Sequence, residues 1–169
     1  EAEKEVTIGS WLVNVDIINN KCELVKFNEP ENFDGKIAIP SVMTYEGKGY
    51  PVTALREGVF AGSDTANKNA LKEKITEIVF ADDSQVKVIP NDFMAAGSGK
   101  EGEKFNLAKV VLPASVEKIG ESAFASYSPK LTEFKIGSNG DANNIDMTNM
   151  NMRQYIELNK RMGLIYNSH

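Results

Sequence analysis

The sequence contains few of the residues that enzymes use most often for catalysis and metal binding. Its 169 residues include one cysteine, Cys22, and one histidine, His169. A single cysteine excludes a disulfide-stapled scaffold, and the two residues together are too few for a zinc cluster. His169 lies outside every motif discussed below, which argues against Ser-His and Cys-His relays. We therefore expect a protein that is not an enzyme, with no catalytic residue, no metal ligand and no cofactor.

An excess of positive charge and a long apolar run are also missing. The chain has 19 lysines and arginines against 24 aspartates and glutamates, a net charge of -5. A nucleic-acid-binding protein needs a basic surface to neutralise phosphates, so we expect no nucleic-acid partner. No stretch approaches the roughly 18 apolar residues of a transmembrane helix, so we expect no membrane span. Residues Glu1–Lys4 contain no apolar core, so we expect no signal peptide within this chain.

The most informative feature that is present is an internal repeat. Three nine-residue segments share one template: an apolar residue, two variable residues, a branched aliphatic residue, three variable residues and two apolar residues. They are Val52–Phe60, Val86–Met94 and Val116–Phe124. Their first residues are separated by 34 and 30 positions. Such agreement is improbable by chance, so the chain is predicted to consist of copies of one supersecondary unit.

A short strand-like run precedes each of the three copies of the template, and a fourth run follows the last copy. Apolar residues alternate toward the end of these runs, which is the period of a half-buried strand. The predicted strands lie in Lys36–Pro40, Ile75–Phe80, Leu107–Pro113 and Leu131–Ile136. A unit of this size cannot bury its apolar side alone, so the copies must stack around a shared core. The polar inserts Gly62–Lys74 and Ala96–Asn106 are expected to form loops on one edge of the stack.

Two hairpins are predicted near the N-terminus. Trp11–Ile17 and Cys22–Phe27 flank a polar turn and are expected to form a hairpin that covers the start of the stack. Cys22 alternates with apolar neighbours, so we interpret it as a small buried hydrophobe rather than a reactive thiol. Residues 44–52 predict a second hairpin, with Tyr45 and Tyr50 paired across its strands.

The C-terminal segment has a different pattern. Between Asp146 and Gly163, the apolar residues Met152, Tyr155, Ile156 and Met162 follow helical spacing. We expect a helix that caps the last open strand, and the same pattern also fits a helix that binds a partner.

The repeats resemble those of the BspA-like leucine-rich-repeat family of bacterial surface proteins, over about residues 33–136. The family unit runs roughly L-T-x-V-x-I-P-x-S-V-x-x-I-G-x-x-A-F. The second copy departs from it at Ala81, Pro90 and Met94. The third copy matches it at Leu107, Val110, Leu112, Pro113, Ser115, Val116, Ile119, Gly120, Ala123 and Phe124.

The resemblance implies a mainly β repeat solenoid, leucine-rich-repeat-like, with short parallel strands and turn or short helical returns. On this interpretation residues 1–169 are a single domain. It has an N-terminal β-hairpin cap at 1–32, about three and a half repeats at 33–136, and a C-terminal linker and helical cap at 137–169. The resemblance also implies a secreted or cell-surface protein used in adhesion.

Stacking predicts a specific surface on the outer side of the strands, because equivalent positions become neighbours about 4.8 Å apart. Two interpretations of this surface stay open. It is either a solvated face that only fixes the strand register, or a contact surface for a protein or a glycan. One row should alternate in charge, and the next should be largely apolar. The candidate residues are Lys36, Glu77, Lys109 and Glu133 in the first row, and Ala38, Val79, Val111 and Lys135 in the second.

Three functions are compatible with these patterns. The first is a non-catalytic extracytoplasmic binding or adhesion module, whose partner is a protein or glycan on a host or neighbouring cell. The second is a structural spacer or assembly protein without a dedicated ligand. The third, a carbohydrate-active enzyme, would need paired carboxylates, for which Asp82 and Asp92 are the candidates. A homodimer through a terminal strand edge is also compatible with the pattern.

Short motifs of other chemistry are weak. Ser115 and Lys118 match the S-x-x-K spacing of acylases but lie inside the repeat template. Gly97–Glu101 lacks the first glycine and the hydroxyl residue of a phosphate-binding loop. Asn139–Asn143 has alternating oxygen side chains but lacks the glycine and glutamate of a calcium loop.

Overall fold

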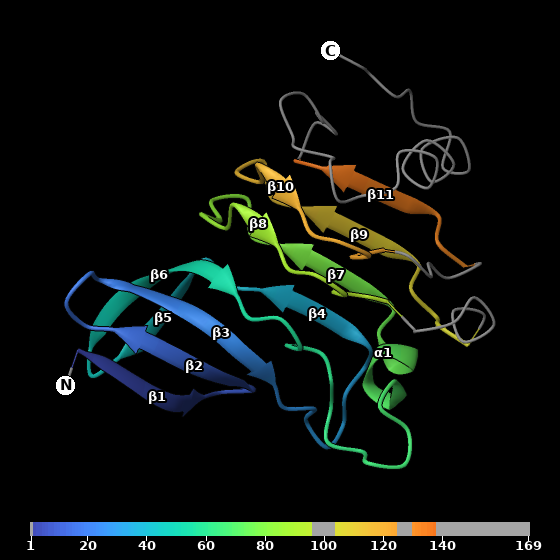
Figure 1. Ribbon diagram of the computed structural model, residues 1–169, viewed down its shortest axis with the longest axis horizontal. Coiled ribbons are helices and arrows are strands. Elements are labelled where there is room, and N and C mark those ends of the chain that lie inside the picture. The colour runs from blue at the N-terminus through green and yellow to red at the C-terminus, as the bar shows by residue number, and fades with distance from the viewer. Residues whose placement is uncertain (1, 96–103, 125–129, 138–169) are drawn as a thin grey trace.

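A computed structural model describes residues 2–95, 104–124 and 130–137 of the chain. This part of the chain is mainly β and contains one short helix, in agreement with the predicted class (Figure 1). The predicted C-terminal helix, Gly97–Glu101 and Asn139–Asn143 lie outside the described residues.

Four of the strands form a parallel sheet, and these are the four predicted from the repeats. Neighbouring strands in the order β11-β9-β7-β4 pair at equivalent positions of the repeat unit, without a shift in register. The four strands are β4 (Lys36–Ile39), β7 (Glu77–Phe80), β9 (Lys109–Leu112) and β11 (Glu133–Ile136). Translational stacking of the copies is therefore confirmed for this sheet.

Alternation along these strands places one apolar residue of each copy in the middle of the core. Ile37, Ile78, Val110 and Phe134 lie side by side, and each is at most 2% exposed. Burial of an aliphatic or aromatic side chain contributes about 1.5–3 kcal/mol to folding. Since every one of the four strands contributes an equivalent residue, these side chains form a continuous row in the core.

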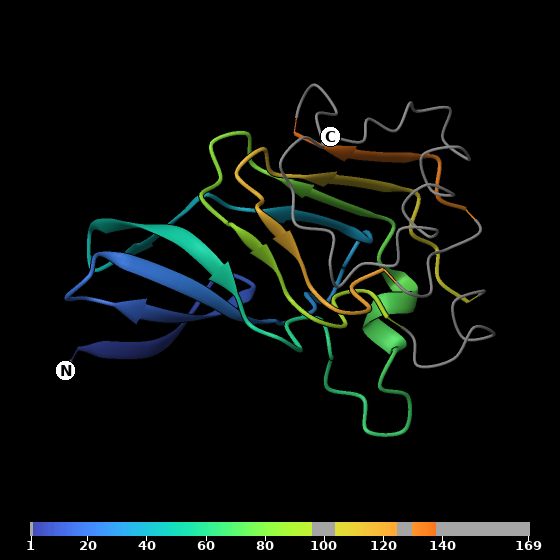
Figure 2. The ribbon, with the colours of Figure 1, turned by 45° about the horizontal axis from the view of Figure 1, so that its top comes forward.

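The nine-residue template forms the opposite side of each repeat. Its fourth residue is buried in all three copies, as Leu55, Ile89 and Ile119. Figure 2 shows the short strands of the second and third copies in a layer beside the parallel sheet. The strands on this side are β6 (Lys48–Leu55), β8 (Val88–Ile89) and β10 (Lys118–Ile119), of which β8 and β10 pair in parallel.

Aromatic rings connect one copy of the repeat to the next inside the core. The ring centroids of Phe60 and Phe93 are 5.1 Å apart, and those of Phe93 and Phe124 are 6.0 Å apart. In the first and third copies the ring belongs to the ninth residue of the template. In the second copy Met94 occupies this position, and the preceding residue, Phe93, supplies the ring. Met94 is itself buried, and the departure from the family pattern therefore leaves the aromatic series unbroken.

A second sheet of five strands lies at the N-terminal end. Its order is β1-β2-β3-β6-β5, and β2 and β3 pair antiparallel where the sequence predicted a hairpin. The first strand was not predicted, because its first three residues are charged and exposed, and only Val6 and Ile8 at its end show apolar alternation. Phe27 joins this sheet to the repeats through a ring contact with Phe60 at 6.4 Å. The strands not yet given are β1 (Glu3–Ile8), β2 (Trp11–Asp16), β3 (Lys21–Phe27) and β5 (Val42–Tyr45).

The second predicted hairpin is present, but its cross-strand pairing differs from the prediction. Tyr45 lies opposite Lys48, and Tyr50 lies opposite Met43, so the expected tyrosine pair is wrong. The turn contains only Glu46 and Gly47, with φ angles of 49° and 78°. A two-residue turn with two positive φ angles matches the twist of a hairpin, and it sets a different register from the three-residue turn assumed from the glycines.

The insert Gly62–Lys74 is not a simple loop, which corrects another expectation. It contains the helix α1 (Ala70–Lys74), and Leu71 from this helix is 2% exposed. The Nζ atom of Lys72 donates hydrogen bonds to the carbonyl oxygens of Asp92 and Ala95 at 3.2 and 3.0 Å. Burial lowers the pKa of Lys72. The helix therefore fastens the insert to the second copy of the template.

Each copy of the template also has one residue in the left-handed region of the backbone, always at the seventh position. The φ angles are 86° for Gly58, 56° for Asp92 and 55° for Ser122. Replacing Gly58 by alanine should lower the free energy of unfolding by about 1–2 kcal/mol, measured by urea denaturation. Nothing lies within 4 Å of an added Cβ, so the backbone conformation alone causes the loss.

Gly58→Asn is the matched control for this prediction. Asparagine tolerates the left-handed region better than alanine, so the loss should be about half as large. Equal losses for the two variants would contradict the backbone explanation.

Candidate interaction surface

The outer face of the parallel sheet brings the predicted site residues together. Strand pairing places Lys36 next to Glu77, Glu77 next to Lys109, and Lys109 next to Glu133. The predicted order of alternating charge is therefore confirmed. Lys36 is exposed and the other three side chains are half-buried.

The charges in this row are partly paired at the end near β11. The Nζ atom of Lys109 lies 3.4 Å from Oε2 of Glu133, and the Nζ atom of Lys135 lies 3.4 Å from Oε1 of the same side chain. Exposed pairs of this kind contribute about 0.2–1 kcal/mol each. Their main effect is on register, because a shifted strand would bring like charges together.

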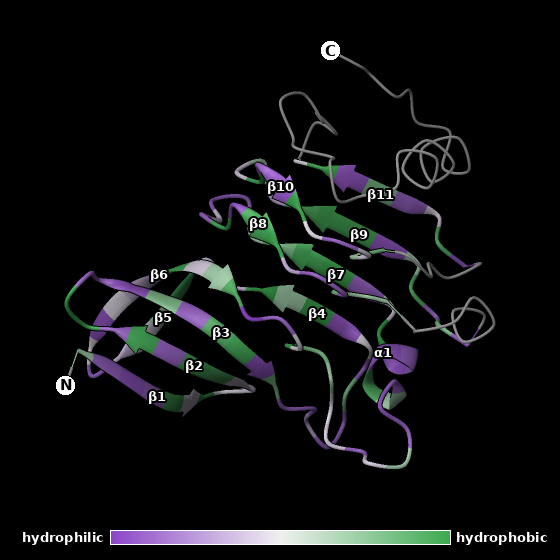
Figure 3. Ribbon diagram, viewed as in Figure 1, coloured by the Kyte–Doolittle hydropathy of each residue, from purple (hydrophilic) through white to green (hydrophobic). Residues whose placement is uncertain are grey.

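The second predicted row lies beside the first. Ala38 pairs with Val79, Val79 with Val111, and Val111 with Lys135. Ala38 is exposed and the two valines are half-buried, so the row forms a narrow apolar strip between charged residues. Figure 3 shows β7 and β9 hydrophilic where they begin and hydrophobic beyond. We refer to these eight residues as the sheet face.

The carboxylates considered for catalysis lie in two turns of the second copy of the repeat. Asp82 and Asp83 lie in the turn after β7, and Asp92 lies in the left-handed turn of the second copy. All three are exposed. Among residues 2–95, 104–124 and 130–137, no group of three or more histidine, cysteine, aspartate or glutamate residues is arranged to hold a metal ion.

The acylase-like pair has a structural explanation. The Oγ atom of Ser115 donates a hydrogen bond of 2.6 Å to the carbonyl oxygen of Val86. This bond joins two successive copies of the repeat unit. The serine in this motif therefore serves the stacking of the repeats.

Cys22 is buried, as the alternation predicted. Its side chain is 2% exposed, and Sγ lies 3.5 Å from the carbonyl oxygen of Tyr50. Burial raises the pKa of the thiol from 9.0 to about 11. A thiol that stays protonated near neutral pH is a poor nucleophile.

One feature of the surface was not predicted from the sequence. A groove of about 350 Å³ lies between β6 and the strands β8 and β10. Val88 in this groove is 47% exposed and pairs with Lys118. The sequence feature that could have indicated this groove is the third position of the template. Its residues, Ala54, Val88 and Lys118, differ in chemistry, whereas the fourth position is aliphatic in every copy.

Within the described part of the chain, no helix has the length and apolar character needed to cross a bilayer.

Comparison with known proteins identifies the fold. No protein-family model and no curated protein matches the chain. A leucine-rich repeat protein of known structure from Bacteroides capillosus ATCC 29799 is 19% identical, with a TM-score of 0.50, over 81% of this chain and 98% of that protein. A leucine rich cell surface protein from Faecalibacterium prausnitzii A2-165 is 18% identical, with a TM-score of 0.38, over 86% of this chain and 54% of that protein. The first likeness shows a leucine-rich-repeat fold, as the sequence resemblance implied.

The charge row gives a salt-dependent prediction. Glu133→Lys should lower the free energy of unfolding by about 0.5–1 kcal/mol, because it places a third lysine between Lys109 and Lys135. Urea denaturation at ~0.02 M and ~0.5 M sodium chloride should show that about half of the loss disappears at the higher salt concentration. Glu31→Lys is the control, since Glu31 is exposed and forms no ion pair in the described part of the chain. A loss that does not depend on salt would refute the electrostatic role.

The raised pKa of Cys22 gives a pH-dependent prediction. The folded chain keeps the thiol proton up to about pH 11, whereas the unfolded chain releases it near pH 9.0. The free energy of unfolding should therefore fall between these two pH values, and more steeply for the native protein than for Cys22→Ala. Alkylation by iodoacetamide should also be at least ~100-fold slower in the folded than in the urea-unfolded chain. Equal alkylation rates would be inconsistent with a buried thiol.

Proposed function

We propose that this protein is a non-catalytic binding module that contacts a protein or glycan partner through the sheet face. The observation that carries the proposal is the unshifted strand register, which aligns Ala38, Val79 and Val111 in one strip. Side chains of this kind on a half-exposed face supply apolar contact area, and the flanking charges restrict which partners fit.

The stacked architecture supports a binding role. Repeat proteins present extended surfaces because each copy adds an equivalent strip next to the last one. We propose that residues 33–136 form a repeat solenoid, that residues 1–32 cover its first copy with a β-hairpin, and that residues 137–169 cap its last copy. The ring contacts from Trp11 to Phe27 at 5.0 Å and from Phe27 to Phe60 at 6.4 Å support the covering role of the hairpin.

The resemblance of the repeats to those of BspA-like bacterial surface proteins supports a secreted or cell-surface location and a role in adhesion. A partner on a host or neighbouring cell follows from that location. A homodimer through a terminal strand edge is a further part of the proposal, because edge strands offer backbone groups for pairing.

A spacer without a dedicated ligand is the second candidate function. It is favoured by the ion pairs of Glu133 with Lys109 and Lys135, which neutralise part of the sheet face within the protein itself. Arrays of glycans and extracellular-matrix proteins separate the two functions, because a spacer would bind nothing on either array.

Replacing both valines of the sheet face should abolish binding to any partner that the arrays identify. In the variant Val79→Lys with Val111→Glu, the new charges alternate along the row up to Lys135. The melting temperature should therefore stay within about 2 °C of the native value, because attractive cross-strand pairs replace the lost apolar contact.

Val42→Lys is the control, since it introduces a lysine on an exposed valine of a different strand, outside the sheet face. It should leave binding by the sheet face unchanged. Intact binding by the double variant would remove the sheet face as the contact surface.

A further inference from the structure

The two sides of the repeat stack differ in how far their hydrogen-bonded pairing extends. The parallel sheet is continuous through all four of its strands, whereas on the other side β6 belongs to the five-stranded sheet and β8 pairs with β10 in a separate one. From Val52 to Leu55, β6 pairs in parallel with β3, with a shift in register between Cys22 and Glu23. The edge of this part of β6 that faces away from β3 pairs with no described strand. The edge of β8 that faces away from β10 also pairs with no described strand.

The groove of about 350 Å³ is lined by residues of these two strands and of β10. Figure 2 shows the backbones of β6 and β8 on the same side of the molecule. The volume of the groove falls in the range of sites that hold small groups or a few side chains. Val88 in the groove is one of four large apolar side chains that are exposed in the described part of the chain, with Ile17, Ile18 and Val42. The groove is lined by Thr53, Ala54, Leu55, Glu57, Lys87, Val88, Pro90, Asn91, Lys118 and Gly120.

One wall of the groove is fixed in place by close contacts. The Oδ1 atom of Asn91 accepts a hydrogen bond of 2.7 Å from the backbone N–H of Glu121. A Cβ atom on Gly120 would lie 2.6 Å from the backbone nitrogen of Asn91, so only glycine fits there. Such a wall loses little conformational entropy when a partner binds, which favours recognition.

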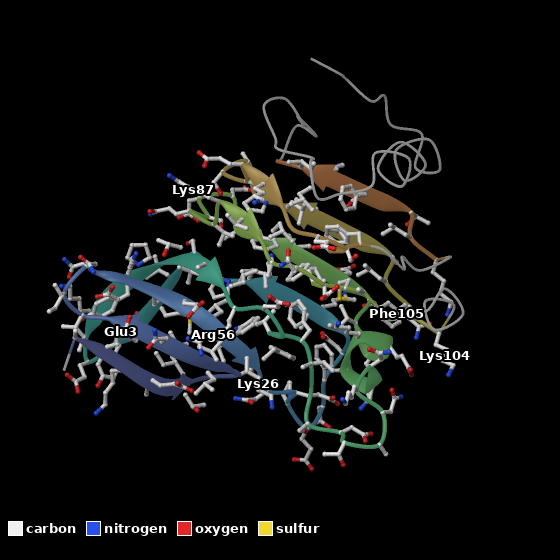
Figure 4. All side chains as sticks on the ribbon, in the orientation of Figure 1. Glu3, Lys26, Arg56, Lys87, Lys104 and Phe105 are labelled. Atoms are coloured by element: carbon white, nitrogen blue, oxygen red, sulfur yellow. The ribbon has the colours of Figure 1, made fainter. Side chains whose placement is uncertain are left out.

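Two lysines and one glutamate line the groove, so its charge is positive on balance. Lys87 and Lys118 form no ion pair in the described part of the chain, in contrast to Lys109 and Lys135 on the sheet face. Figure 4 shows Lys87 on the β8 side of the molecule. Glu57 is the single acidic residue in the lining. An acidic group of a partner would therefore meet two available ammonium groups.

We propose that this groove binds an extended, acidic segment of a partner protein. An apolar side chain of the segment packs on Val88, and its carboxylates pair with Lys87 and Lys118. The backbone of the segment forms hydrogen bonds with the open strand edge of β6 or β8, as peptides do when they add to the edge of a sheet. This site lies apart from the sheet face and does not depend on the function proposed for it.

The test uses the full chain and a fluorescein-labelled peptide of eight residues in which glutamate and valine alternate. Fluorescence anisotropy should show binding of this peptide, and at least ~10-fold weaker binding of a peptide in which lysine replaces every glutamate. The groove variant Lys87→Glu with Lys118→Glu should reverse this preference. Val88→Ser should weaken binding of the glutamate peptide by about tenfold.

Two control variants keep the outcome unambiguous. Lys4→Glu with Lys68→Glu makes the same change in net charge on exposed lysines outside the groove and should leave the affinity unchanged. Val79→Lys with Val111→Glu alters only the sheet face and should also have no effect. Absence of binding below about 1 mM, or equal weakening in the groove variant and the lysine control, would overturn the proposal.

Discussion

The unshifted parallel pairing of β4, β7, β9 and β11 is the constraint on which the rest of the structure depends. It places each buried residue of one copy against the equivalent residue of the next, so that Ile37, Ile78 and Val110 form a continuous core. A slip of one residue would turn every buried side chain toward solvent. The same register decides which outer residues become neighbours, so the core and the sheet face follow from a single geometric fact.

The opposite side of the stack shows where strict repetition ends. The fourth template position is buried in every copy, yet β6 pairs with β3 while β8 pairs with β10. A strand has two edges. At one edge of β6, the strand β3 of the N-terminal sheet takes the place that the strand of an earlier repeat would take in a longer stack. The groove beside Val88 results from this junction between two kinds of sheet.

The aromatic series explains how the chain accepts irregular copies. Phe93 supplies the ring that the second copy lacks at its usual position, and Met94 fills the space that remains. Thioether side chains adapt to irregular gaps, so the substitution costs little packing. The insert that follows Phe60 is accommodated in a similar way, because Leu71 is buried and Lys72 binds backbone carbonyl groups of the next copy.

The sequence by itself determined the strands of the repeats, the order of residues in both rows of the sheet face and the burial of Cys22. These follow from alternation along a strand and translation between copies, which are local rules. Only the tertiary structure decided the register of Tyr45 and Tyr50, the edge strand β1, the helix around Leu71 and the groove beside Val88. Each of these depends on competition between segments for strand edges or for apolar surface, and that competition is settled only when the whole chain packs.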